Sequence, residues 1–230
     1  MSITNEQLKL VLMGFPLGTI ITEELRKPSQ PFTSEMLTMI GYDRLTNLEK
    51  LIDAIIMNNI EGDVIETGIW RGGACIFMEK LLQGTNKKVF VADSFEGLPK
   101  PNEERYPIDK GDRHHAIEFL SVTLETVKQN FLKYTTLDNV IFLQGWFKDT
   151  LPLLKNKFSI IRLDGDMYES TMDALTYLYP LLTIGGYCII DDYGCVFNCP
   201  FAVDDYRVAN NITEPIIKID NCGIYWKKLR

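Results

Sequence analysis

Short apolar runs alternate with stretches of helical periodicity along most of this chain, and no other feature constrains its fold as strongly. The apolar runs cover residues 63–67, 88–94, 140–145, 158–165 and 186–192. Helical patterns separate them, over residues 74–82, 116–134 and 168–182. This alternation is typical of parallel strands joined by crossover helices. The sequence therefore predicts an α/β fold with a mostly parallel sheet and helices on both faces.

The two ends of the chain depart from this alternation. Residues 6–13 and 20–26 have helical patterns, "RKPSQPF" then breaks any helix, and a further helical pattern runs from Ser34 to Ile56. We expect residues 1–57 to form an N-terminal helical lid and residues 58–230 the main domain. Near the C-terminus, "PIIKID", the turn "NCG" and "IYWK" predict an antiparallel hairpin at the edge of the sheet.

The overall charge and the cysteines narrow the classes of function. The net charge of −7 argues against a general affinity for nucleic acid or for an anionic membrane surface. No apolar run approaches the roughly 20 residues of a membrane span. The five cysteines are odd in number and lie mostly in apolar runs, which favours reduced thiols and a cytoplasmic location.

Each predicted strand ends on polar or acidic residues. The strand ends read Glu66-Thr-Gly, Asp93-Ser-Phe, Gln144-Gly-Trp, Asp164-Gly-Asp166 and Asp191-Asp192. A single aspartate at such a place often only caps the next helix. In a parallel sheet, however, all five strand ends lie on one edge, where ligands bind. Together they predict a binding site.

The turn after the first strand helps to identify the ligand. "ETGIWRGG" lacks the middle glycine of a dinucleotide fingerprint, because Ile69 and Trp70 stand there, and no Walker lysine follows. Gly68 leaves room for a slim uncharged chain, Glu66 can accept from an ammonium group, and Asp93 can bind the two hydroxyls of a ribose. This combination favours S-adenosylmethionine (SAM) over NAD or ATP.

Three aspartates at neighbouring strand ends suggest a metal ion. If the fourth and fifth strands are adjacent, Asp164, Asp191 and Asp192 converge and raise one another's pKa unless a cation lies among them. Hard oxygen ligands suit Mg²⁺ or Ca²⁺ rather than zinc. Such an ion lowers the pKa of a bound substrate hydroxyl and holds it in line with a methyl donor.

Several long motifs carry a resemblance to a known family. "GDVIETGIWRGGACIFM", "VFVADSFEGLP", "QGWFKDTLP" and "RLDGDMYESTMDALTYLYPLLTIGGYCIIDDYG" resemble the macrocin O-methyltransferase family, over about residues 38–228. The resemblance implies a Rossmann-like class I SAM-dependent methyltransferase with a seven-stranded sheet. It also implies Mg²⁺-dependent methylation of a sugar hydroxyl on a natural product or glycan, a small-molecule acceptor, and a homodimer or larger homo-oligomer.

The resemblance also assigns residues to roles. It implies Asp164, Asp191 and Asp192 as metal ligands, with Asp164 as the catalytic base. The expected cofactor-binding residues are Met39, Glu66, Gly68, Arg71, Gly72, Gly73, Asp93, Ser94, Phe95, Gly145, Trp146, Phe147 and Asp164. Met39 is expected on a helix that starts within "TSEMLTMIG" and covers the cofactor.

The position of the catalytic base differs from that in a more distant relative, the catechol O-methyltransferase type. That group has a lysine base where this chain has Met167, which leaves Asp164 as the first candidate and Asp166 and His115 as alternatives. Asp166 is also a candidate N-cap for the helix that follows. Two other functions stay open: a metal-dependent hydrolase that uses the three aspartates, and a SAM-fold protein that acts only as a binding module.

Overall fold

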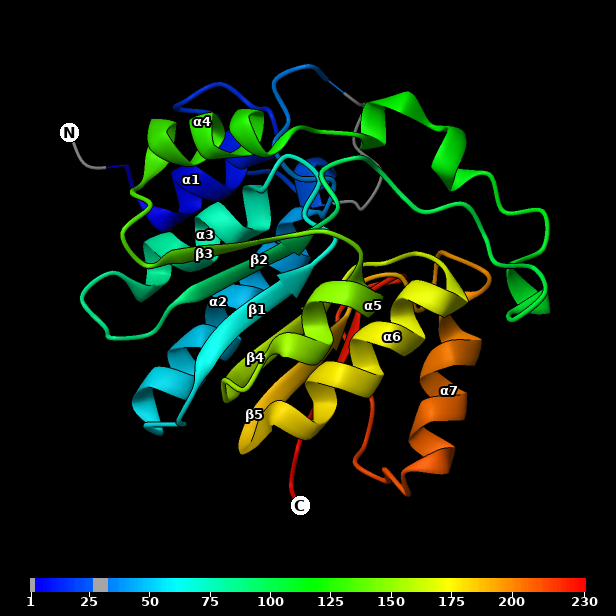
Figure 1. Ribbon diagram of the computed structural model, residues 1–230. Helices are drawn as coiled ribbons and strands as arrows, with labels where there is room; N and C mark the ends of the chain where they lie inside the picture. The colour runs from blue at the N-terminus through cyan, green and yellow to red at the C-terminus, as the bar shows by residue number, and fades with distance from the viewer. Residues whose placement is uncertain (1–2, 27–32) are drawn as a thin grey trace.

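The computed structural model describes residues 3–26 and 33–230. Its seven-stranded sheet has the order β3-β2-β1-β4-β5-β7-β6 (Figure 1). The first five strands pair in parallel, while β7 runs antiparallel to both β5 and β6. The strands are β1 (Asp63–Thr67), β2 (Val89–Asp93), β3 (Val140–Gln144), β4 (Phe158–Leu163), β5 (Leu182–Ile190), β6 (Ile217–Lys218) and β7 (Ile224–Lys227). The predicted parallel sheet and edge hairpin are confirmed.

Helices cover both faces of the sheet (Figure 1). They are α1 (Asn5–Leu12), α2 (Tyr42–Met57), α3 (Gly73–Leu82), α4 (Leu124–Tyr134), α5 (Phe147–Thr150), α6 (Tyr168–Leu178) and α7 (Cys199–Ala209). Successive strand residues alternate between faces, so Val64 packs in the core under α1–α4 and Ile65 in the core under α5–α7. Both faces are buried, which explains why the central strands read as continuous apolar runs.

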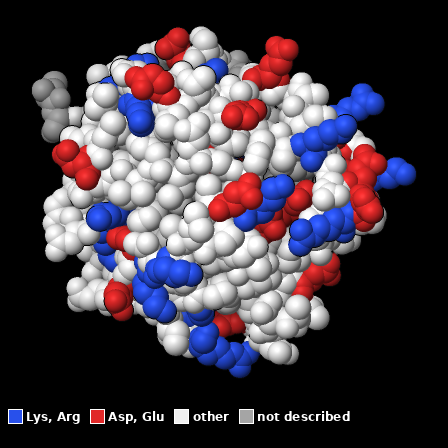
Figure 2. All heavy atoms as spheres, in the orientation of Figure 1, with Lys and Arg blue, Asp and Glu red and all other residues white. Residues whose placement is uncertain are grey.

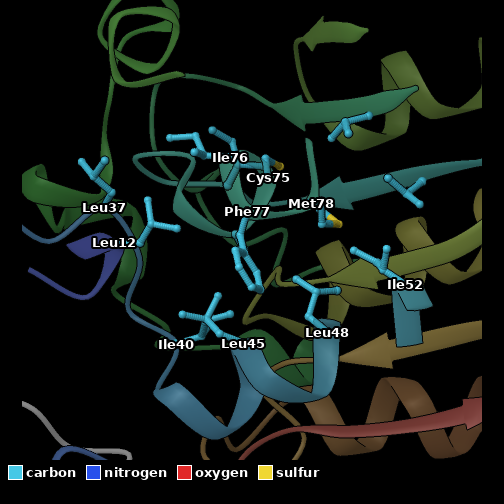
Figure 3. Packing of buried hydrophobic residues seen from close by; sticks show 14 of the residues in the cluster. Leu12, Leu37, Ile40, Leu45, Leu48, Ile52, Cys75, Ile76, Phe77 and Met78 are labelled. Carbon is cyan, nitrogen blue, oxygen red and sulfur yellow. The ribbon is translucent and has the colours of Figure 1, made fainter. Parts of the chain in front are cut away.

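The N-terminal helices belong to the first of these cores. Leu12 of α1, Leu45 and Leu48 of α2 and Phe77 of α3 are almost fully buried and pack together (Figure 3). Helix α2 thus forms part of the layer over the sheet. The predicted boundary between residues 57 and 58 stays a prediction.

The predictions of two helices near the N-terminus are wrong in part. Within residues 20–26 only a 3₁₀ turn forms, η1 (Glu24–Arg26), and residues 33–41 contain no helix, so that α2 begins at Tyr42. The amides of Leu37 and Thr38 donate to the carbonyl of Leu12, and the Leu37 carbonyl accepts from Gly73 N–H at 2.8 Å. The apolar spacing of residues 36–40 therefore reflects burial beside α3 rather than helical periodicity.

The connection between β2 and α4 is long and irregular. Residues 94–123 contain three 3₁₀ turns, η2 (Pro107–Asp109), η3 (His114–Ala116) and η4 (Glu118–Leu120). The helix predicted from residue 116 begins only at Leu124, because the Thr123 hydroxyl accepts from Thr126 N–H and caps it. This connection reaches across the carboxyl ends of the strands, where it can form part of a binding site.

The surface and the helix lengths bear on possible partners. On the face shown in Figure 2, basic and acidic side chains are interspersed, and no large patch of one sign covers it. Among the described residues, no helix has the length and apolar character needed to cross a membrane.

Candidate active site

A pocket opens at the carboxyl ends of the central strands. Its empty space, part of which is open to solvent, is about 820 Å³. Its lining comes from the turns after β1, β2, β3 and β4, from residues 38–40 and from Leu120 of the long connection. The pocket thus lies at the edge of the sheet where the sequence predicts a ligand.

Most of the predicted cofactor residues meet in this pocket. Those in its lining are Met39, Glu66, Gly68, Asp93, Ser94, Gly145, Trp146, Phe147 and Asp164. Four others lie outside the lining: Arg71, Gly72, Gly73 and Phe95. Phe95 is buried and its ring lies 6.4 Å from that of Phe142. Met39 is in the lining although the helix predicted for it is absent.

The glycines after β1 serve close backbone packing. Gly68 has φ +76°, and a Cβ there would overlap the carbonyl oxygen of Asp164. A Cβ on Gly73 would lie 2.6 Å from the Leu37 carbonyl oxygen, and one on Gly72 would meet Val127 of α4. Gly68 thus allows the turns after β1 and β4 to touch, while Gly72 and Gly73 let α3 approach its neighbours.

Asp93 joins two turns at the base of the pocket. Its carboxylate accepts from Ile69 N–H at 2.9 Å and from Phe95 N–H at 2.7 Å. Burial raises the pKa of Asp93, and these backbone donors oppose the rise. The carboxylate fixes the turns after β1 and β2 relative to each other, and it still lines the pocket.

The three predicted metal ligands do converge. Asp164, Asp191 and Asp192 each offer a carboxylate oxygen, and these oxygens lie within 4.8 Å of one another. Asp164 follows β4, and the other two follow β5, which pairs with β4. Asp164 also lines the pocket. The candidate metal centre and the pocket therefore share a residue.

A buried arginine, Arg162 of β4, organises the acidic groups. Its guanidinium donates to Glu66 and Asp191, and to Asp164 at 3.0 Å. Asp191 accepts a further bond from Arg44 of α2. The sequence analysis missed Arg162, although a charged residue inside an otherwise apolar strand signals a buried ion pair.

The pKa values of the two adjacent aspartates, Asp191 and Asp192, shift in opposite directions. Burial alone would raise the pKa of Asp191, but Arg162 and Arg44 overcome this effect and lower it. Burial raises the pKa of Asp192 well above its usual range, and Asp164 raises it further. Burial and Asp191 likewise raise the pKa of Asp164, although Arg162 opposes the rise.

The charges at this edge of the sheet do not balance. Two guanidinium groups, on Arg44 and Arg162, face six carboxyl groups, on Glu66, Asp164, Asp166, Asp191, Asp192 and Asp220. Asp192 is buried and Asp164 and Asp166 are half-buried, and charges withdrawn from water without partners are unfavourable. Oxygen donors with excess negative charge fit a hard divalent cation such as Mg²⁺.

Asp166 is not the cap of α6, so that prediction is wrong. The N-cap position is Met167, without a side-chain hydrogen bond, and Asp166 has φ 57°. The cap comes from Asp109, whose fully buried carboxylate accepts from Tyr168 N–H and Glu169 N–H, both at 2.9 Å. Asn198 donates to the same carboxylate, so Asp109 joins three segments beside the aspartates.

The residues around Asp166 bear on the choice of base. Asp166 lines the pocket, and its N–H donates to Asp192 at 3.2 Å. Burial raises its pKa, and the charge of His114 opposes this rise. His114 in turn lies 2.9 Å from the Asp112 carboxylate. The neighbouring His115 is exposed and does not line the pocket.

Comparisons with known proteins agree with this geometry. The family model described as Macrocin-O-methyltransferase (TylF) matches residues 18–228. Demethyldecarbamoylnovobiocin O-methyltransferase of Streptomyces niveus is 44% identical over 217 residues, which cover 90% of this chain and 82% of that protein. The 8-demethyl-8-(2,3-dimethoxy-alpha-L-rhamnosyl)-tetracenomycin-C 4'-O-methyltransferase of Streptomyces olivaceus is 45% identical over 196 residues, which cover 83% and 75%. The structure of the O-methyltransferase NovP superposes with a TM-score of 0.91 at 41% identity, covering 98% of both chains.

Proposed function

The chain belongs to the macrocin-O-methyltransferase (TylF) family, and we propose that it transfers a methyl group from SAM to a sugar hydroxyl of a natural product with the help of Mg²⁺. As a member of this family it is an O-methyltransferase. One observation carries the finer proposal: Asp164 belongs both to the pocket lining and to the cluster of three aspartates. A methyl donor in the pocket and a hydroxyl at the cluster would therefore be neighbours.

The pocket offers groups suited to each part of SAM. Asp93 would accept from the ribose hydroxyls, and Trp146 and Phe147 would flank the adenine. Glu66, whose pKa burial raises, would face the methionine end together with Gly68. An acidic pocket also suits the positive sulfonium. Methyl transfer needs little covalent help from the protein, so its main task is in-line positioning.

The aspartate cluster would hold the divalent ion. Asp164 shares Arg162 with Glu66 and Asp191, and the charges nearest to Asp192 are other carboxylates, while Arg44 and Arg162 hold Asp191 in place. When bound, the ion would lower the pKa of the acceptor hydroxyl. The chain's own part is to fix three carboxylates on two adjacent strand ends and to bury them.

Asp164 is the proposed base, with Asp166 as the alternative. Both line the pocket, and burial raises the pKa of each carboxyl, which makes the carboxylate a better proton acceptor near neutral pH. His115 is a weaker candidate, because it is exposed and lies outside the pocket lining. The hydrolase alternative lacks support, since the relatives reported above are O-methyltransferases.

The relatives guide the choice of acceptor. One is named for the 4'-O position of a compound that carries a rhamnosyl group, and another is named for demethyldecarbamoylnovobiocin. By analogy we assign this chain a glycosylated small molecule, rather than nucleic acid or a membrane component. We keep a homodimer or larger homo-oligomer as part of the proposal. The five free cysteines support a reducing compartment such as the cytoplasm.

A methyl-transfer assay tests the proposal. The purified protein is incubated with SAM, Mg²⁺ and a panel of O-desmethyl glycosides of aminocoumarin, macrolide and aromatic polyketide type, and products are analysed by mass spectrometry. A product with one added methyl group on the sugar supports the proposal. Asp164→Ala should abolish this product while it changes SAM affinity by less than about tenfold. Full activity in excess EDTA would rule out the metal, and methylation of the aglycone alone would rule out the sugar.

A further inference from the structure

Two segments that are distant in sequence cover the pocket. Thr38, Met39 and Ile40 come from the irregular segment 33–41, and Leu120 comes from the connection between β2 and α4. Neither segment is a regular strand or long helix, and the middle of segment 33–41 is joined to Leu12 and Gly73 by three backbone hydrogen bonds. Their positions over the pocket must depend on contacts with the body of the domain.

Two adjacent side chains in the turn after β1 hold these segments. Arg71 donates from one guanidinium nitrogen to the carbonyls of Ser34 at 2.8 Å and Met36 at 2.7 Å. The indole N–H of Trp70 donates to the carbonyl of Phe119 at 2.8 Å. The guanidinium carbon of Arg71 lies 4.3 Å from the centre of the Trp70 ring, within cation–π distance. We call these two residues the Trp70–Arg71 clamp.

The backbone of the clamp is itself fixed. Trp70 has φ 47° and is buried, an uncommon conformation for a bulky residue that only firm surroundings maintain. Asn130 of α4 donates to the Arg71 carbonyl at 3.1 Å. With this backbone conformation the side chains of Trp70 and Arg71 contact different segments. Backbone strain of this kind is found mostly at functional sites.

We propose that Trp70 and Arg71 are positioning residues that hold the two covering segments over the cofactor pocket and so set how long SAM stays bound. This inference rests on the proposed function, because it takes SAM as the occupant of the pocket. This role differs from the direct cofactor contact predicted for Arg71. The residue is outside the pocket lining, and its guanidinium donates to the carbonyls of Ser34 and Met36. Charged hydrogen bonds to carbonyls are among the stronger ones, so their loss should mainly speed dissociation.

The test measures binding and release of S-adenosylhomocysteine, the demethylated product of SAM, by calorimetry and stopped-flow fluorescence. We expect Arg71→Ala to raise the dissociation rate about tenfold with little change in the association rate. Arg71→Lys, which keeps a cationic donor, should recover part of this loss. Trp70 itself lines the pocket, and Trp70→Phe keeps an aromatic ring there but removes the indole N–H, so it should raise the dissociation rate several-fold.

Arg207→Ala serves as the matched control. Arg207 donates to the Glu214 carbonyl at 2.6 Å and lies over the ring of Trp226, so it makes the same two kinds of contact away from the pocket. Its loss should lower thermal stability but leave release of S-adenosylhomocysteine unchanged. Hydrogen exchange should become faster in residues 33–41 of Arg71→Ala and in residues 117–121 of Trp70→Phe, but not in α3.

The outcomes separate the inference from the proposed function. If the wild-type protein does not bind S-adenosylhomocysteine, the proposed function fails. If the wild type binds it and Arg71→Ala releases it at the wild-type rate, the clamp is wrong. Should Arg71→Ala fail to fold, Arg71→Lys and Trp70→Phe decide the question, and wild-type release rates in both would overturn the inference.

Discussion

Neutralising Asp191 and neutralising its neighbour Asp192 should change the stability of the metal-free protein in opposite directions. Both carboxylates are buried, at 5% and 6% exposure, and both substitutions to asparagine keep the size of the side chain. They differ only in their surroundings. Asp191 lies between the guanidinium groups of Arg44 and Arg162, whereas the nearest charges to Asp192 are other carboxylates.

The magnitudes follow from these surroundings. Asp191→Asn removes one carboxylate from two buried arginines, while Arg162 keeps Glu66 and Asp164 and Arg44 keeps Asp220. No buried charge is left without a partner, so we expect a loss of about 1–3 kcal/mol. Asp192→Asn removes a carboxylate whose pKa burial and Asp164 raise. Each pKa unit of elevation corresponds to about 1.4 kcal/mol, so we expect a gain on the order of 1 kcal/mol. The amide oxygen of the new asparagine can still accept from Asp166 N–H.

The pH dependence gives a second check with a defined sign. A folded-state pKa that is raised, as for Asp192, adds stability below the unfolded value near pH 4 and loses it as the pH rises through the folded value. A lowered pKa, as for Asp191, adds stability above about pH 4 that is lost as the pH falls. The two variants should therefore differ most near neutral pH and converge in acid.

The assay is urea unfolding followed by circular dichroism, in EDTA at pH 7.5 and at about pH 3, below the unfolded pKa of an aspartate. Added Mn²⁺ should stabilise the wild type by mass action and should stabilise neither variant to the same extent. If Asp191→Asn is as stable as the wild type, the claim that Arg44 and Arg162 stabilise the Asp191 carboxylate is refuted. If Asp192→Asn loses as much stability as Asp191→Asn, the excess of negative charge is refuted.

Three further predictions concern other parts of the site. Asp109→Ala removes the cap of α6 and three hydrogen bonds, so we expect a loss of about 2–4 kcal/mol in urea unfolding; a loss below 1 kcal/mol would contradict the assigned cap. Gly68→Ala places a Cβ against the Asp164 carbonyl and should weaken Mn²⁺ binding at least tenfold in calorimetry, and wild-type affinity would show that the turns tolerate separation. Burial raises the pKa of Asp173 to about 6, so its stabilising effect fades between about pH 4 and pH 6. Asp173→Asn should flatten stability over that range and add about 1 kcal/mol at pH 7, a modest gain because the carboxyl is partly in water; an unchanged pH profile would contradict it.

The sheet was predictable from sequence because strand burial is a local pattern. The central strands are mostly apolar and end on polar residues at one edge, so the positions of Asp93, Asp164 and Asp191 follow from topology alone. The parallel order also brings Asp164 next to Asp191 and Asp192 without any knowledge of side-chain contacts.

The features that were missed depend on contacts between distant segments. The apolar spacing of residues 36–40 looks helical, but those residues are buried because the segment packs on Leu12 and Gly73. Asp166 has the local position of a cap, yet Asp109, some 60 residues away, performs that role. Local periodicity carries no information about such long-range hydrogen bonds. Of these missed features, Arg162 had a local signal, namely a charged residue within an apolar strand.

Calorimetry with SAM tests the central claim most directly. The account predicts that the wild-type protein binds SAM with a dissociation constant in the micromolar range, about 8 kcal/mol, at one site per chain. Substituting Asp93 by alanine should weaken this binding at least tenfold, because the carboxylate lines the pocket and fixes the turns after β1 and β2. Absence of measurable SAM binding to the folded wild-type protein would contradict the account.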